Sequence, residues 1–135
     1  MVKQPRSISG VGPARRGFTL IEMLVVMAVV ALLMTVALPR YFGALERSKE
    51  VALQENLRVM RVMIDRFNAD KGRYPEQLSE LVEQRYLRAV PVDPMTESDS
   101  SWITVPSSDP EQPGIADVKS GARGQASDGR SFDAF

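Results

Sequence analysis

The residue with the clearest chemical meaning is Glu22, the only charged residue in an apolar run from Phe18 to Leu38. A carboxylate inside a membrane-spanning helix costs up to about 2.5–3.5 kcal/mol unless a partner or a proton neutralises it. Cleavage between Gly17 and Phe18 would create such a partner. The new amine of Phe18 is a cation four residues before Glu22, one helical turn away, or within reach from a neighbouring chain. We therefore predict that Glu22 is an assembly latch, whose unpaired charge is relieved when a second chain docks beside it.

The element that must position Glu22 is the apolar run itself. Its roughly 20 residues form a helix long enough to cross the hydrocarbon core of a bilayer once. Arg15 and Arg16 precede the run directly, whereas the charges after Pro39 are mixed. The positive-inside rule then keeps the N-terminus in the cytoplasm, anchors the chain in lipid and exports the residues after Pro39. In a Gram-negative cell, this places the C-terminal part in the periplasm.

An ordinary secretory signal peptide is the alternative interpretation of this segment. It would also combine a basic start with an apolar run, and Thr35-Val36-Ala37 is a passable cleavage site. The run is longer than the core of a signal peptide, usually about 7–15 residues. A disposable segment also gains nothing from the cost of Glu22, so we favour a retained membrane helix.

Composition excludes several classes of function. The chain of 135 residues, enough for one domain, has no cysteine and no histidine. Disulfides, thiol catalysis and thiolate metal sites are thereby excluded, and the commonest acid–base group is missing. Seventeen basic residues balance seventeen acidic ones, so no net field favours nucleic acid. We predict a protein that is not an enzyme and has no nucleic-acid partner.

The segment 39–71 reads as an amphipathic stem helix. Pro39 should kink or interrupt the helix near Thr35, or else simply mark the exit from the membrane. Glycine at position 72 suits a C-cap. The apolar residues recur at helical spacing and predict a buried stripe: Leu53, Leu57, Met60, Ile64 and Phe67. Opposite charges three or four residues apart predict four ion pairs: Glu46/Lys49, Glu55/Arg58, Arg61/Asp65 and Arg66/Asp70.

Residues 72–135 predict a small head of mixed structure. Pro75 begins a short helix that runs to about Arg85, and strands are expected over 102–105 and 115–119, with a loop over 106–113. The resulting fold class is α+β, a long helix packed on a small antiparallel sheet of two to four strands. A head of this size is marginal alone, so the stem stripe should supply about half of its core.

A calcium ion is one further way to stabilise a head that has no disulfides, because the ligands of calcium are oxygens. Asp117, Asp128 and Asp133, with nearby carbonyl groups, are the predicted ligands. The alternative is that these aspartates only occupy turns.

The N-terminal motif resembles the prepilin cleavage and methylation signature of type IV pilins and type II secretion pseudopilins. It reads Arg15-Arg16-Gly17-Phe18-Thr19-Leu20-Ile21-Glu22, followed by the apolar run and Pro39. The resemblance implies a leader of residues 1–17, removed by a prepilin peptidase that also N-methylates Phe18, and a mature membrane helix over 18–38. It also implies that Glu22 contacts the Phe18 amine of an adjacent subunit.

The head is similar to that of G-type major pseudopilins. The resemblance rests on Gly72-Arg73-Tyr74-Pro75, Leu78, Leu81, Tyr86-Leu87, Pro91, Asp93-Pro94 and the run from Asp117 to Gly121. It implies a pilin-like fold and, in that family, a bound calcium. Arg123 stands where an acidic residue is common, and Met95-Thr96 replaces the usual Trp-Gly, so the implied calcium site departs from the pattern.

The function implied is that of a structural subunit of a type II secretion pseudopilus. Such a subunit lies in the inner membrane and assembles with copies of itself and minor pseudopilins on an inner-membrane assembly platform. The resulting helical fibre extrudes folded proteins. A type IV or competence-type pilin is the nearest alternative, and a periplasmic protein with an ordinary signal peptide is another.

Overall fold

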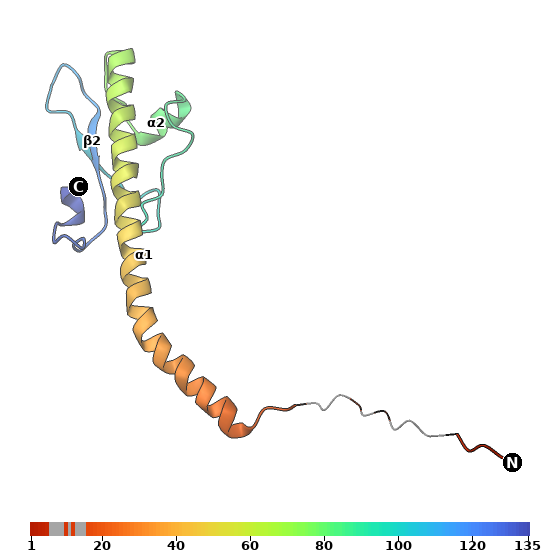
Figure 1. Ribbon diagram of the computed structural model, residues 1–135. Coiled ribbons are helices and arrows are strands. Elements are labelled where there is room, and N and C mark those ends of the chain that lie inside the picture. Colours follow the sequence, from red (N-terminus) through yellow and green to blue (C-terminus); the bar gives the residue numbers. More distant parts are fainter. Residues whose placement is uncertain (6–9, 11, 13–15) are drawn as a thin grey trace. The chain divides into compact units, whose positions relative to one another are not determined.

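The computed structural model describes residues 1–5, 10, 12 and 16–135. Its elements, in chain order, are α1 (Leu20–Lys71), α2 (Leu78–Glu83), β1 (Ile103–Pro106), β2 (Ile115–Lys119) and the short 3-10 helix η1 (Phe132–Ala134) (Figure 1). The chain divides into two compact units, Met1–Pro39 and Arg40–Phe135. The predicted α+β class, a long N-terminal helix with a small antiparallel sheet, is confirmed.

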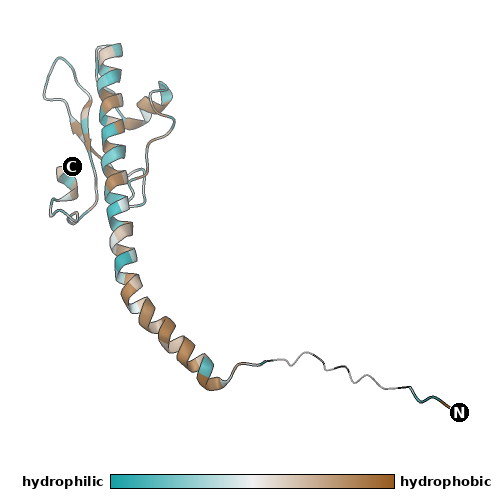
Figure 2. Ribbon diagram, in the orientation of Figure 1, coloured by the Kyte–Doolittle hydropathy of each residue, from teal (hydrophilic) through white to brown (hydrophobic). Residues whose placement is uncertain are grey.

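In the first unit, α1 begins at Leu20, two residues later than predicted, because Thr19 precedes its first turn as an N-cap. In Figure 2, the ribbon of this part of the helix is coloured as hydrophobic along almost its whole length. It is the one helix in the described part of the chain that is long and apolar enough to cross a membrane. Arg15 and several other residues of the predicted leader lie outside the described residues.

Pro39 lies inside α1, and the helix continues through it to Lys71. The predicted interruption near Thr35 is therefore wrong, whereas the kink that we gave as the other possibility stays a prediction. Proline removes one amide donor, but the surrounding turns retain enough backbone hydrogen bonds to keep a long helix continuous. What Pro39 does mark is the end of the apolar segment, since Arg40 begins the charged stem.

The second unit is built around the stem part of α1. All five residues of the predicted stripe are buried, so that prediction is confirmed. They form one core with side chains from the head: Leu81, Trp102, Ile115, Val118, Ala126 and Phe132. Figure 1 shows α2 on one side of this stem and β2 with the C-terminal segment on the other. Burial of each large apolar side chain contributes about 1.5–3 kcal/mol, so the stripe holds the head to the stem.

The stem ends as predicted at a glycine C-cap. Gly72 has a φ of 70°, in the left-handed region, and its N–H donates to the carbonyl of Asn68 at 2.9 Å. Glycine adopts this conformation without the strain that a Cβ would add. The turn sends the chain back along the stem towards α2.

Helix α2 is shorter than predicted. Gln77 is extended at its N-cap, and Arg85, with a φ of 63°, ends the turn that follows. Leu81 is its fully buried residue. Beyond it, the Tyr86 ring packs on Phe67 at 5.3 Å between centroids.

The Tyr86 hydroxyl donates to Asp70 at 2.8 Å, which raises the pKa of Tyr86. Asp70 therefore binds the head rather than forming the predicted pair with Arg66.

The sheet consists of β1 and β2, paired antiparallel with Ile103 opposite Lys119 and Thr104 opposite Val118. Both strands agree with the prediction to within one residue. The register shifts at Pro106, which has no N–H to donate. After β2 the chain passes so close to Ser101 that a Cβ on Gly121 would lie 2.0 Å from its carbonyl oxygen. Only glycine permits this approach.

The contact between Arg73 and Glu80 makes the head sensitive to acid. Arg73 Nη2 donates to Glu80 Oε1 at 2.5 Å, and the backbone N–H of Glu76 donates to Oε2 at 2.8 Å. These bonds hold the pKa of Glu80 below its ordinary value of 4.5. Because the folded pKa is lowered, the stabilisation is present above the ordinary value and is lost as the pH falls through the folded pKa.

We expect Arg73→Met to reduce this acid sensitivity. The variant should lose only a small part of its stability at pH 7, because Arg73 is half exposed and solvent screens its charge, and it should lose less on acidification than the parent. Thermal unfolding of the full chain in detergent at pH 7 and pH 3 measures both effects, with Arg88→Met as the control. The same acid-induced loss in Arg73→Met and the parent would contradict this explanation.

Candidate functional site

The predicted cleavage junction is accessible. Gly17 and Phe18 lie before α1, outside any helix or strand; both are exposed, and a Cβ built on Gly17 would meet no atom within 4 Å. Proteases cut segments of this kind because the peptide must enter an active site without unfolding a helix. The geometry therefore suits a cut between these two residues.

Glu22 forms a capping box with Thr19. The backbone N–H of Glu22 donates to Thr19 Oγ1 at 3.2 Å, and the N–H of Thr19 faces Glu22 Oε2 at 3.5 Å. In such a box, the N-cap hydroxyl and the N3 carboxylate satisfy amides that the first helical turn leaves free. The carboxylate also lies at the positive end of the helix dipole. These local contacts lower the cost of placing Glu22 in an apolar segment.

In the uncut chain, Phe18 lies outside the helix, which begins at Leu20. Pairing of Glu22 with the Phe18 amine after cleavage, in the same chain or a neighbouring one, stays a prediction. The carboxylate reaches towards Thr19, the residue next to the amine that cleavage would create. The sequence itself indicates this arrangement, because Thr19-Leu20-Ile21-Glu22 has the S/T-x-x-E spacing of a capping box.

In the second unit, Arg61 connects the stem to the sheet. Its Nε donates to Asp117 Oδ1 at 2.7 Å, and its Nη2 donates to the carbonyl of Val118 at 2.9 Å and that of Phe135 at 2.6 Å. The predicted pairing of Arg61 with Asp65 is therefore wrong. By contrast, the pairs Glu46/Lys49 and Glu55/Arg58 are present, at 3.9 and 2.7 Å.

The three predicted calcium ligands do not come together. Asp117 is engaged by Arg61, Asp128 pairs with Arg130 at 2.7 Å, and Asp133 accepts a hydrogen bond from Ser131. Among the described residues, no group of three acidic side chains could hold a metal ion. Because Asp117 and Asp128 each pair with an arginine, their carboxylates do not fit a shared calcium site. These aspartates are better explained by the ion pairs and turns that they form.

A buried carboxylate that we did not predict as a site is Asp93, which is fully buried. Its Oδ2 accepts a hydrogen bond from Ser120 and its Oδ1 accepts one from the N–H of Met95 at 2.8 Å. These bonds tie the Pro91–Pro94 turn to the end of β2. Asp93 therefore acts in the structure of the head, and its partner Ser120 is too distant in sequence to be found from spacing.

We expect Arg61→Leu to destabilise the head by about 1.5–3 kcal/mol, because hydrogen bonds from a charged donor are lost and Asp117 keeps no partner on the stem. Arg58→Leu is the matched control, an exposed pair on the same helix whose loss should cost far less, because solvent screens it. Urea unfolding of the full chain in detergent measures both. Equal losses in the two variants would refute the special contribution of Arg61.

The described chain combines an exposed junction, a capped acidic residue at the start of a membrane-length helix, and a head packed on the stem. An N-terminal apolar helix preceded by a prepilin motif fits membrane anchoring. Residues 12–38 match the family described as the prokaryotic N-terminal methylation motif.

One curated relative is similar to part of the chain. Over 74 residues, 55% of this chain, the sequence is 32% identical to the type IV major pilin protein PilA of Myxococcus xanthus (strain DK1622). The aligned region spans about a third of that protein, 34% of its length. No solved structure matches the chain. These similarities support a prepilin-like family.

Proposed function

We propose that this chain is a filament subunit of a type II secretion pseudopilus, resembling the G-type major subunit. The observation that carries the proposal is the exposed Gly17–Phe18 junction directly before a capped, membrane-length helix that contains Glu22. The prepilin motif and the similarity to a major pilin support it. The subunit builds a fibre and catalyses no reaction.

In this proposal, a prepilin peptidase cuts between Gly17 and Phe18 on the cytoplasmic face of the inner membrane and methylates the new amine. Residues 18–38 then anchor the mature chain, while the head lies in the periplasm. Because Glu22 is held at the start of α1 by Thr19, its carboxylate stays at one defined height in the membrane. The Phe18 amine of a docking subunit neutralises it there, which favours assembly over separate subunits.

A type IV pilin is the second candidate, favoured by the similarity to a type IV major pilin. The two share the motif, the membrane helix and the stem. The missing cysteine and the Asp93-Pro94 turn, which resembles the G-type head, favour secretion. A periplasmic protein released after Ala37 would instead lose α1 up to that residue, along with Glu22.

Deletion of the gene separates these candidates. A pseudopilin deletion should abolish the export of folded proteins across the outer membrane and leave surface pili and twitching unchanged. A type IV pilin deletion should remove pili and leave the secreted proteins unchanged. Comparing culture supernatants and sheared surface filaments from the parent, the deletion and a complemented strain measures both, and intact secretion in the deletion would contradict the secretion assignment.

A further inference from the structure

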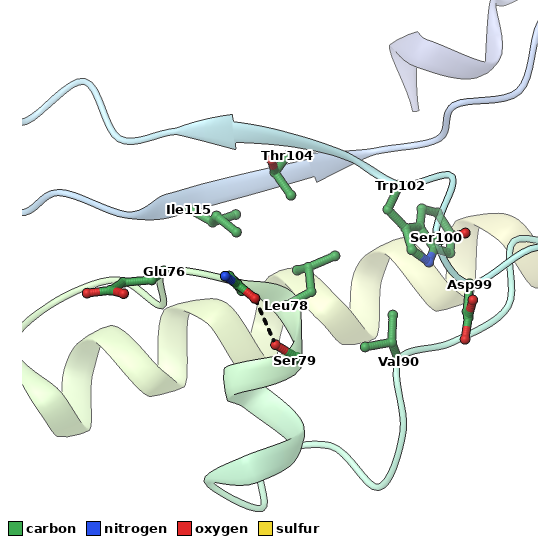
Figure 3. A pocket seen from close by; sticks show the side chains of 10 residues that line it. Glu76, Leu78, Ser79, Val90, Asp99, Ser100, Trp102, Thr104 and Ile115 are labelled. Atoms are coloured by element: carbon green, nitrogen blue, oxygen red, sulfur yellow. Dashed lines mark hydrogen bonds between the residues drawn. The ribbon is translucent and has the colours of Figure 1, made fainter.

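A groove in the head lies between α2 and the sheet. Its floor is apolar, formed by Leu78, Val90, Trp102 and Ile115, and its volume is about 430 Å³. Figure 3 shows Leu78 and Ile115 facing each other across it. A cavity of this size accommodates an aromatic side chain with its neighbours, because small-ligand sites start at roughly 300 Å³.

The two ends of this α2 groove are acidic. Glu76 lies at one end and Asp99 at the other (Figure 3). Neither carboxylate forms an ion pair within the part of the chain that the structure describes, whereas Glu80 of α2 is paired with Arg73. An apolar floor between two unpaired acids suits an occupant that combines an aromatic side chain with a base.

This chain contains such a segment just beyond its apolar run. Among the described residues, the aromatic side chains in the exposed class are Phe18, Tyr41 and Phe42, at 76%, 64% and 58%. Tyr41 and Phe42 contact each other edge to face, with 5.9 Å between ring centroids, and Arg40 directly precedes them. Phe18, by contrast, lies at the opposite end of the membrane-length segment.

The Arg40–Phe42 segment cannot fill the groove of its own chain. The groove lies beside the stem between two contacts: Asn56 donates to the carbonyl of Val92, next to Pro91, which accepts from Trp102, and Asn68 donates to Gln112, just before β2. Phe42 is on the same helix, and at 1.5 Å per residue it lies roughly 20 Å from Asn56 and roughly 40 Å from Asn68 along the axis. A rigid helix holds the two apart.

We propose that, in the filament, the Arg40–Phe42 segment of one copy docks into the α2 groove of a second copy. The aromatic pair covers the apolar floor, and Arg40 pairs with Glu76 or Asp99. The proposal rests on the filament function proposed above. It also limits the geometry, since the two parallel copies must be staggered along their stems by roughly 20–40 Å.

Engineered cysteines test the contact directly, because the chain has none of its own. Phe42→Cys is combined with Gln77→Cys, which lines the groove, and the control combines Phe42→Cys with Ala134→Cys, an exposed residue of η1. Filaments are sheared from cells and oxidised, and cross-linked chains are counted on non-reducing gels. We expect several-fold more cross-linking for the groove pair, as a ladder of multiple chains, and none for either single cysteine.

A charge exchange provides the second readout. Arg40→Glu should reduce filament yield several-fold, and Glu76→Arg or Asp99→Arg should restore it. Arg47→Glu, another exposed base on the stem, should not be restored by either change. Filaments that form without groove cross-links, equal cross-linking of both cysteine pairs, or no restoration by either exchange would overturn the docking proposal. Any of these three results would be expected if Tyr41 and Phe42 instead lie at the membrane surface. If the parent chain forms no filaments, the function proposed above fails instead.

Discussion

Glu22→Gln is expected to abolish filament growth while leaving cleavage after Gly17 intact. Glutamine also completes a capping box, so the substitution keeps the start of α1 and removes only the charge. Without a charge there is no unpaired carboxylate for a neighbouring amine to relieve, and the preference for the assembled state is lost. The measurement is the yield of sheared filaments, with immunoblotting of the membrane fraction to show that mature subunit is present.

Thr19→Ala distinguishes the role of Glu22 in assembly from its role in the capping box. It removes the hydroxyl that accepts the N–H of Glu22 but leaves the carboxylate, and it should cost about 0.5–2 kcal/mol at the helix start. Thr19→Ser keeps the hydroxyl and is the control. If Glu22→Gln assembles normally and Thr19→Ala does not, then Glu22 serves only as a cap and the latch is wrong.

Replacement of Gly17 by leucine should leave nearly all of the chain as uncut precursor. The leucine side chain would lie directly before the scissile bond. A peptidase whose site accepts glycine at this position would have to accommodate it. A Cβ added at Gly17 or at Gly12 would meet no atom within 4 Å, so both variants should fold equally well. Gly12→Leu is therefore the matched control, and it should be cut normally.

Electrophoretic mobility of the chain in membranes measures this effect. Precursor should accumulate in Gly17→Leu alone, and filaments should be absent. Mature-sized protein in the Gly17→Leu strain would show that the junction lies elsewhere, and accumulation of precursor in Gly12→Leu would show that the variant acts on the leader in general.

The sequence predicted the parts of the fold that depend on local periodicity. The stripe from Leu53 to Phe67 repeats at the helical period, and all of its members are buried. Gly72 was recognisable as a C-cap for a similar reason, since a glycine directly after a helix is the residue that adopts a positive φ most easily. The two strands followed from short segments that contain β-branched residues and lie between turn residues.

Contacts between distant segments were not predictable in this way. Asp65 lies four residues after Arg61, but in the folded chain Arg61 of the stem pairs with Asp117 of the sheet. Glu50 likewise accepts hydrogen bonds from Ser127, near the other end of the chain, at 2.8 and 2.7 Å. Spacing rules describe only one element at a time, so they assigned Asp117 to a calcium site instead of to this ion pair.

The mass of the native N-terminus decides whether the mature chain starts at Phe18 and keeps Glu22. Subunit is purified from sheared filaments or membranes, digested and examined by mass spectrometry. We predict an N-terminal peptide that begins with N-methylated Phe18 and contains Glu22. A peptide that begins after Ala37 would contradict the account, because the carboxylate on which assembly depends would have been removed.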